Sequence, residues 1–188
     1  QLADEHELLL IFDEVQTGCG RTGQWFAYQH FGVTPDVMTL SKAICGGLAG
    51  GALLTTREIA PSLRPGMHAC TFGGNAIAAC AGIATLETIE QDHLLEHAQQ
   101  ISAQFRTRLE ALQATCPLIR EVRLVGLMIG LELTINGGPV VEACLQRQLL
   151  VNCTHNTVIR LLPAMTLTPQ QVDQGCDILA AALQSVSA

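Results

Sequence analysis

Lysine is almost missing from this chain of 188 residues, because Lys42 is the single one among ten lysines and arginines. Charged residues make up only 14% of the sequence, the net charge is −7 and the arginines are scattered. A sequence without a basic stripe argues against a nucleic-acid partner. Ordinary soluble surfaces use lysine freely, so one lysine placed directly after an apolar run favours a chemical role for Lys42.

Long apolar runs and paired cysteines are missing as well. No run approaches the roughly 20 residues needed to cross a bilayer, and the first residues resemble neither a signal peptide nor a transit sequence. The eight cysteines contain no Cys-x-x-Cys pair, which favours buried free thiols in a reducing compartment. We expect a soluble cytoplasmic protein with no membrane partner, and the mitochondrial or plastid matrix as the alternative location.

Residues 1–90 have the pattern of an α/β lobe. The apolar run 7–13 ends in an acid, as buried parallel strands with a functional residue at the carboxyl end do. Further strands are predicted at 36–40 and 51–55, followed by an Ala-rich helix at 75–90. A strand so close to a first residue that is not Met predicts that the chain belongs to a longer protein.

Residues 91–188 change to an α+β pattern. Apolar residues recur every three or four positions from Asp92 to Ala114, which predicts one long amphipathic helix. An alternating stretch at 118–134, broken near Gly126, predicts an antiparallel strand pair. The remaining expected elements are a helix at 139–148, a strand at 158–162 and a final helix that opens with a Thr168–Gln171 capping box and reaches about Leu183.

Two residues with useful chemistry each follow an apolar strand, where open parallel sheets place their ligands. Lys42 supplies an amine and Asp13 a carboxylate. An enzyme that uses pyridoxal 5′-phosphate (PLP) needs both groups, the amine to bond the cofactor and the carboxylate to keep its ring nitrogen protonated. The pair therefore makes a PLP site the leading hypothesis.

The motifs around these residues resemble the signature of the class III aminotransferases. The first motif is Asp13-Glu14-Val15-Gln16-Thr17-Gly18, followed by Gly20-Arg21-Thr22-Gly23 and then by Ser41-Lys42-Ala43. The resemblance implies an α/β fold, namely the C-terminal part of a fold-type I PLP-transferase large domain at 1–90 with an α+β small domain at 91–188. It also implies a transaminase that uses PLP and works as a homodimer with shared active sites.

The resemblance implies a role for each residue of the first motif. Asp13 would pair with the ring nitrogen, Val15 would pack on the ring face, and Gln16 would hydrogen-bond near the phenolic oxygen. Glu14 would support the cofactor site from behind. Lys42 would bond the cofactor and then move the proton between the α-carbon of the substrate and the cofactor.

Two further stretches resemble substrate- and phosphate-binding segments of the family. In His68-Ala69-Cys70-Thr71-Phe72-Gly73-Gly74-Asn75, the resemblance assigns Thr71 to the cofactor phosphate of the partner subunit. Cys70 stands where a serine is usual and would touch the substrate. In 156–163 the resemblance assigns Arg160 to the substrate carboxylate, which its planar fork can hold with two hydrogen bonds.

The segment 151–155 resembles the acetylornithine branch of the family more than the ornithine or 4-aminobutyrate branches. This favours a transfer of the distal amino group of N-acetylornithine to 2-oxoglutarate, a step of arginine biosynthesis. The alternatives are another class III aminotransferase, acting on ornithine, succinylornithine or 4-aminobutyrate, or a non-catalytic dimerisation module. Because the resemblance covers only about half of a family member, we expect the isolated chain to be inactive.

Two other motifs match patterns of unrelated sites. The glycines at 18–23 match Gly-x-Gly-x-x-Gly after a strand, but no acid follows a second strand at the spacing of a dinucleotide site. His93-Leu94-Leu95-Glu96-His97 matches a zinc-protease pattern. Leu94 and Leu95 indicate instead an amphipathic helix with solvated polar residues, so we expect no metal.

Overall fold

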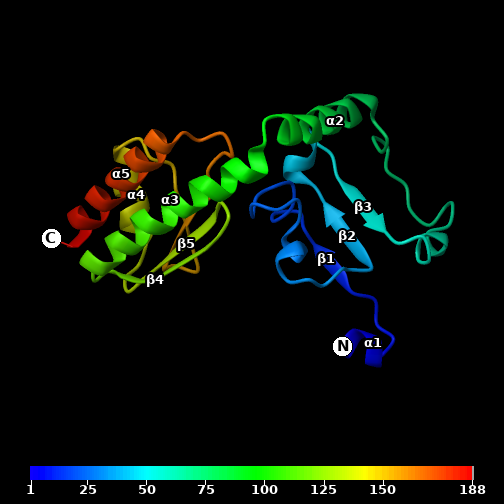
Figure 1. The fold of residues 1–188 in the computed structure, drawn as a ribbon, viewed down its shortest axis with the longest axis horizontal. Helices are drawn as coiled ribbons and strands as arrows, with labels where there is room; N and C mark the ends of the chain where they lie inside the picture. Colours follow the sequence, from blue (N-terminus) through cyan, green and yellow to red (C-terminus); the bar gives the residue numbers. More distant parts are fainter. Residues whose placement is uncertain (188) are drawn as a thin grey trace. The chain divides into compact units, whose positions relative to one another are not determined.

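The computed structural model describes residues 1–187, and the chain divides into two compact units at Leu94 and Leu95 (Figure 1). We call the part up to Leu94 unit 1 and the part from Leu95 unit 2. The expected boundary lay near residue 91, and equating the two units with the large and small domains of the family remains a proposal. Within the described residues, no helix is both long and apolar enough to span a bilayer.

Unit 1 is built on a three-stranded sheet with the order β1-β2-β3. Strands β1 (Ile11–Asp13) and β2 (Val37–Leu40) run parallel, whereas β3 (Ala52–Thr55) is antiparallel to β2. The helices of this unit are α1 (Leu2–Glu5) and α2 (Ala76–Gln91), with short 3-10 turns at Ala27–His30, Lys42–Cys45 and Ala60–Ser62. Its parallel pair leaves the ends of β1 and β2 on the same edge.

The first strand is shorter and more exposed than its sequence predicts. Only Ile11–Asp13 of the run 7–13 pairs with β2, and Ile11 is 60% exposed. Within the described residues, β1 has a neighbouring strand on one side alone. The expectation of a buried strand was therefore wrong, because an apolar run indicates a strand without showing which residues would bury it.

Unit 2 contains a four-stranded antiparallel sheet with the order β4-β5-β7-β6. Its strands are β4 (Ile119–Val125), β5 (Met128–Leu133), β6 (Asn152–Thr154) and β7 (Val158–Leu161). Its helices are α3 (Leu94–Thr115), α4 (Gly138–Gln146) and α5 (Pro169–Ser187). The pattern had predicted all of these elements except β6.

Alternation along β5 separates a core face from a polar face of this sheet. Leu127, Ile129, Leu131 and Leu133 are fully buried, as the sequence predicted. They join one apolar cluster with the inward side chains of all three helices, among them Ile101, Phe105, Val140 and Leu179. Unit 2 thus has a closed core of its own.

Local hydrogen bonds explain where two helices begin. Asn75 caps α2, since its side-chain oxygen accepts from the backbone N–H groups of Ile77 and Ala78 at 2.9 and 3.2 Å. The capping box of α5 is present as expected. The Thr168 N–H donates to Gln171 Oε1 at 2.8 Å, and the Gln171 N–H donates to Thr168 Oγ1 at 3.3 Å.

Candidate active site

Asp13 and Lys42 lie at the carboxyl ends of the two parallel strands. Asp13 is the last residue of β1 and stands in register with Thr39 of β2, and Lys42 opens the 3-10 turn two residues after β2 ends. Lys42 has φ of 49°, a left-handed conformation that non-glycine residues adopt rarely and often at functional sites. The turn presents an exposed amine for which no hydrogen bond or ion pair is found within residues 1–187.

The carboxylate of Asp13 is held at one oxygen and open at the other. Its Oδ1 accepts the Val15 N–H at 2.9 Å, which fixes the direction of the side chain as the chain leaves β1. Oδ2 has no partner among the described residues, and the side chain is exposed. Val15 and Gln16 follow it directly and are half-buried. A cationic group could therefore approach Asp13 from the strand end.

Glu14 faces away from this open edge and organises the loop behind it. It is only 3% exposed, and its two carboxylate oxygens accept from the Thr17 hydroxyl, from the Ala27 N–H at 3.0 Å and from the Tyr28 N–H at 2.9 Å. All three donors belong to the segment between β1 and β2. The arrangement suits the supporting role that the sequence suggested for Glu14.

The loop that carries Lys42 is tightly closed. The Ser41 hydroxyl donates to the Gly50 carbonyl at 2.9 Å, which joins the two ends of the loop. A Cβ at Gly50 would lie 2.4 Å from Cys45 Sγ, and a Cβ at Gly51 would lie 2.9 Å from the Leu40 carbonyl oxygen. Glycine is thus required where the loop closes on β2.

A cleft of about 670 Å³ lies within unit 1 beside this loop. Its lining includes Ser41, Cys45, Cys70, Phe72, Gly73 and Asn75. The structure therefore brings Cys70 into the same hollow as the residue before Lys42, although the two are far apart in the sequence. Thr71 is exposed on the loop before α2, and its hydroxyl has no partner within the described chain.

Arg160 belongs to unit 2, on the polar face of β7. Its Nε donates to the side-chain oxygen of Asn152 on β6 at 3.1 Å. Its terminal amino groups have no partner among the described residues. Arg160 is half-buried, so a carboxylate could reach these two donors. Sequence reasoning did not single out Asn152, because β6 has only three residues and no recognisable period.

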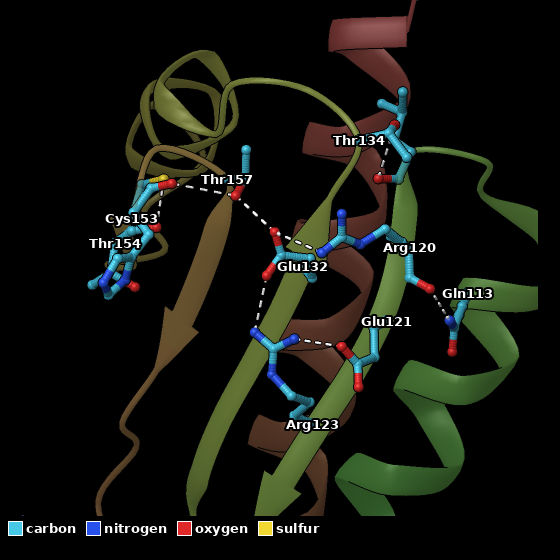
Figure 2. A network of polar contacts seen from close by, with 11 residues as sticks. Gln113, Arg120, Glu121, Arg123, Glu132, Thr134, Cys153, Thr154 and Thr157 are labelled. Atoms are coloured by element: carbon cyan, nitrogen blue, oxygen red, sulfur yellow. Dashed lines mark hydrogen bonds and ion pairs between the residues drawn. The ribbon is translucent and has the colours of Figure 1, made fainter.

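A second polar cluster on the same sheet was also missed, and Figure 2 shows it from close by. Glu132 of β5 accepts from Thr157 Oγ1 at 2.7 Å and from Arg123 Nη2 at 3.0 Å, and it lies 3.6 Å from Arg120 Nη2. The hydroxyl of Thr157 and the guanidinium of Arg123 hold the pKa of Glu132 below its usual value. Arg123 also pairs with Glu121. The alternation placed Glu132 on this face but could not show its partners.

The two motifs that match other kinds of site lie in the loop after β1 and at the start of α3. A 3-10 turn of four residues, Ala27–His30, follows the glycines at 18–23, where a dinucleotide site would have the start of an α-helix. His93 has φ of 50° and precedes α3, whereas the ring of His97 contacts the Leu167 carbonyl at 2.8 Å. Across residues 1–187 there is no cluster of three side chains suited to hold a metal.

The groups at the strand ends fit a PLP molecule in kind. A primary amine at Lys42 matches the aldehyde of the cofactor, and an open carboxylate at Asp13 matches a protonated ring nitrogen. The exposed hydroxyl of Thr71 is a suitable donor for a phosphate.

Comparison with known proteins gives one consistent answer. The family model described as "Aminotransferase class-III" matches residues 1–183. The acetylornithine aminotransferase of Methanocaldococcus jannaschii is 44% identical over 92% of this chain and 43% of its own length. The crystal structure of acetylornithine aminotransferase from Elizabethkingia anophelis matches with a TM-score of 0.91 at 33% identity, over 98% of this chain and 47% of that one. Ornithine δ-aminotransferase of Plasmodium falciparum matches with a TM-score of 0.92 at 31% identity, over 98% of this chain and 49% of that one.

The fold is that of a fold-type I PLP enzyme. More closely, the chain belongs to the class III aminotransferase family, whose members use PLP. It spans about half the length of the curated relatives that it matches. Family, fold class and cofactor are thereby as the sequence predicted.

Proposed function

We propose that the protein carrying this chain transfers the distal amino group of N-acetylornithine to 2-oxoglutarate, as a step of arginine biosynthesis in the cytoplasm. The observation that carries the proposal is the placement of Asp13 and Lys42 on adjacent parallel strand ends with their functional groups open. The names of the relatives, at 41–44% identity, support the choice of substrate. Transamination makes amino acids and 2-oxo acids the small-molecule partners.

The cofactor would supply a ring that accepts the electron pair released when a proton leaves the substrate carbon. Lys42 would bond the cofactor, and its freed amine would take that proton and return it at the neighbouring atom. Asp13 would keep the ring nitrogen protonated by placing a negative charge beside it. Val15 would pack on the ring and Gln16 would donate a hydrogen bond to its oxygen.

The remaining roles belong to other segments. Thr71 would bind the cofactor phosphate in the partner subunit of a homodimer, and Cys70 would contact the substrate from the lining of the cleft. Arg160 would bind the α-carboxylate of glutamate through its terminal amino groups, which are open. A planar fork fits a carboxylate better than a point charge does, so lysine at this position should replace arginine only in part.

Another class III aminotransferase is the main alternative, since enzymes named for ornithine share the fold with similar TM-scores. An amino-donor panel on the PLP-loaded protein decides between them. We expect N-acetylornithine to react faster than ornithine, succinylornithine or 4-aminobutyrate at equal concentration. A clear preference for any of the other three would refute the proposed substrate.

A non-catalytic association module is the second alternative, for the chain when it is isolated. Unit 1 exposes many large apolar side chains, which favours self-association. We expect the purified chain of 188 residues to associate and to show no transaminase activity when PLP is added. Substantial activity of this chain by itself would show that it needs no further residues for its active site.

A further inference from the structure

The polar face of the unit 2 sheet carries a row of four aligned residues. Arg123 of β4 stands opposite Gly130 of β5, Gly130 stands opposite Arg160 of β7, and Arg160 stands opposite Asn152 of β6. Residues that face each other across a ladder point to the same side of the sheet. Two arginines on one face are therefore separated by a residue without a side chain.

The two arginines have opposite surroundings. Arg123 is bound to two carboxylates, those of Glu121 and Glu132, which occupy both of its terminal amino groups. Arg160 has one hydrogen bond within the described residues, from its Nε to the neutral amide oxygen of Asn152. Arg123 is thus neutralised by its neighbours, whereas Arg160 keeps its charge and both terminal donors.

From this difference we infer that Asn152 is the positioning residue of Arg160. The amide oxygen holds the Nε–H, so the guanidinium plane is fixed while its outer edge stays open. A carboxylate at position 152 would hold the same hydrogen bond but would also cancel the charge, as Glu132 does for Arg123. The inference rests on the proposed function, because it assumes that the open edge binds the carboxylate of the substrate.

The contact itself can be tested without cofactor or substrate. In the 188-residue chain, the Arg160 Nε–H is assigned by its loss in Arg160→Lys, and its exchange with water is followed by ¹⁵N NMR. We expect exchange about fivefold faster in Asn152→Ala, since one net hydrogen bond of about 1 kcal/mol is lost. The same rate in both proteins would overturn the inference.

A double-mutant cycle tests the consequence in the PLP-loaded protein. We expect Asn152→Ala to weaken the binding of glutamate about tenfold in single-turnover measurements, with a smaller change in the maximal rate. In an Arg160→Ala background, the same substitution should have no effect, because Asn152 acts through Arg160. An undiminished effect in that background would mean that Asn152 does not act through Arg160.

Two further variants complete the design. Asn152→Asp should keep the slow Nε–H exchange and still weaken glutamate binding, and binding equal to the wild type would refute the need for a neutral partner. Thr154→Ala, on the same strand and face, is the matched control and should change neither quantity. If Arg160→Ala leaves glutamate binding intact, the proposed clamp fails. If Arg160→Ala weakens binding and Asn152→Ala does not, only the role of Asn152 fails.

Discussion

The two units differ in how completely they bury their apolar residues. In unit 2, one buried cluster extends from Ala98 on α3 to Leu183 on α5 and includes every helix and most strands. In unit 1, large apolar side chains on strands, loops and helix remain exposed, among them Leu8, Leu9, Ile11, Leu53, Leu54, Phe72, Ile77 and Ile83. Yet unit 1 carries Asp13 and Lys42. The unit with the candidate chemistry is thus the one whose core is less complete.

This contrast indicates that stability depends mainly on unit 2 and the candidate chemistry mainly on unit 1. Burial of apolar surface is the main favourable term in folding, so unit 2 has what it needs for its own stability. Unit 1 leaves apolar side chains exposed that a further protein surface would bury, and the chain spans about half the length of its curated relatives. We infer that variants in unit 1 act mainly on chemistry and that core variants in unit 2 act mainly on stability.

Lys42→Ala should have the largest effect of all the variants on turnover. It tests whether a variant in unit 1 can abolish catalysis without changing stability. We expect turnover of the PLP-loaded protein to fall by about 10³-fold or more, since proton transfer by a positioned group alone contributes about 10²–10⁴-fold. In the cofactor-free protein, the unfolding free energy should change by less than about 0.5 kcal/mol, because the side chain is exposed. In the wild-type PLP-loaded protein, borohydride reduction followed by peptide mapping should find the cofactor on Lys42. Cofactor found on another lysine and not on Lys42 would refute the assignment.

Arg160→Ala should have the next largest effect on catalysis. Because Arg160 lies in unit 2, this effect would be an exception to the rule that variants of unit 2 act mainly on stability. We expect the glutamate half-reaction to lose about 2–5 kcal/mol of transition-state stabilisation, the usual result of truncating one partner of a bound charge pair. N-acetylornithine reacts at its distal amine, so its carboxylate is far from the reacting carbon and its half-reaction should suffer less. Single-turnover rates measure both, and equal losses would show that Arg160 is not the clamp.

Some features could be predicted from the sequence because they depend on neighbours along the chain. The alternation of Leu127, Ile129, Leu131 and Leu133 gave the core face of β5, and the Thr168 box gave the start of α5. The order strand, acid, glycine loop and lysine gave the position of the candidate site at two strand ends.

The features that escaped prediction depend on distant partners. The pairing of Glu132 with Arg120 and Arg123 depends on the strand register, which shifts between Ile119 and Glu121. The hydrogen bond between Asn152 and Arg160 joins two short strands, and no pattern in the sequence predicts that these strands pair. The exposure of Ile11 depends on which residues pack against β1, and the residues of the strand itself do not show this.

A matched pair of leucines sharpens the comparison of the two cores. Leu131 on β5 is 0% exposed, whereas Leu53 on β3 is 52% exposed. We expect Leu131→Ala to lower the unfolding free energy by about 2–4 kcal/mol through lost burial and a cavity, and Leu53→Ala to lower it by less than about 0.5 kcal/mol. Denaturant unfolding of the two variants, at a concentration low enough to keep the chain monomeric, measures this. Equal losses would mean that Leu53 is buried in the monomer in solution.

The smallest expected effect concerns pH and the polar face of unit 2. The pKa of Glu132 is lowered in the folded chain by the hydrogen bond from Thr157 and by Arg123, so the ionised form is favoured by folding. Such a group stabilises the fold above its ordinary pKa, and the contribution is lost as the pH falls through the lowered folded value. We expect Glu132→Gln to remove part of the acid-induced loss of stability that occurs below about pH 4.3, the usual pKa of glutamate. Glu142→Gln on α4 is the control, because Glu142 is exposed and has no ion pair within the described residues. Unfolding measured as a function of pH decides the point, and an acid dependence in Glu132→Gln that matches the wild type would place the pH-sensitive stabilisation outside unit 2's polar cluster.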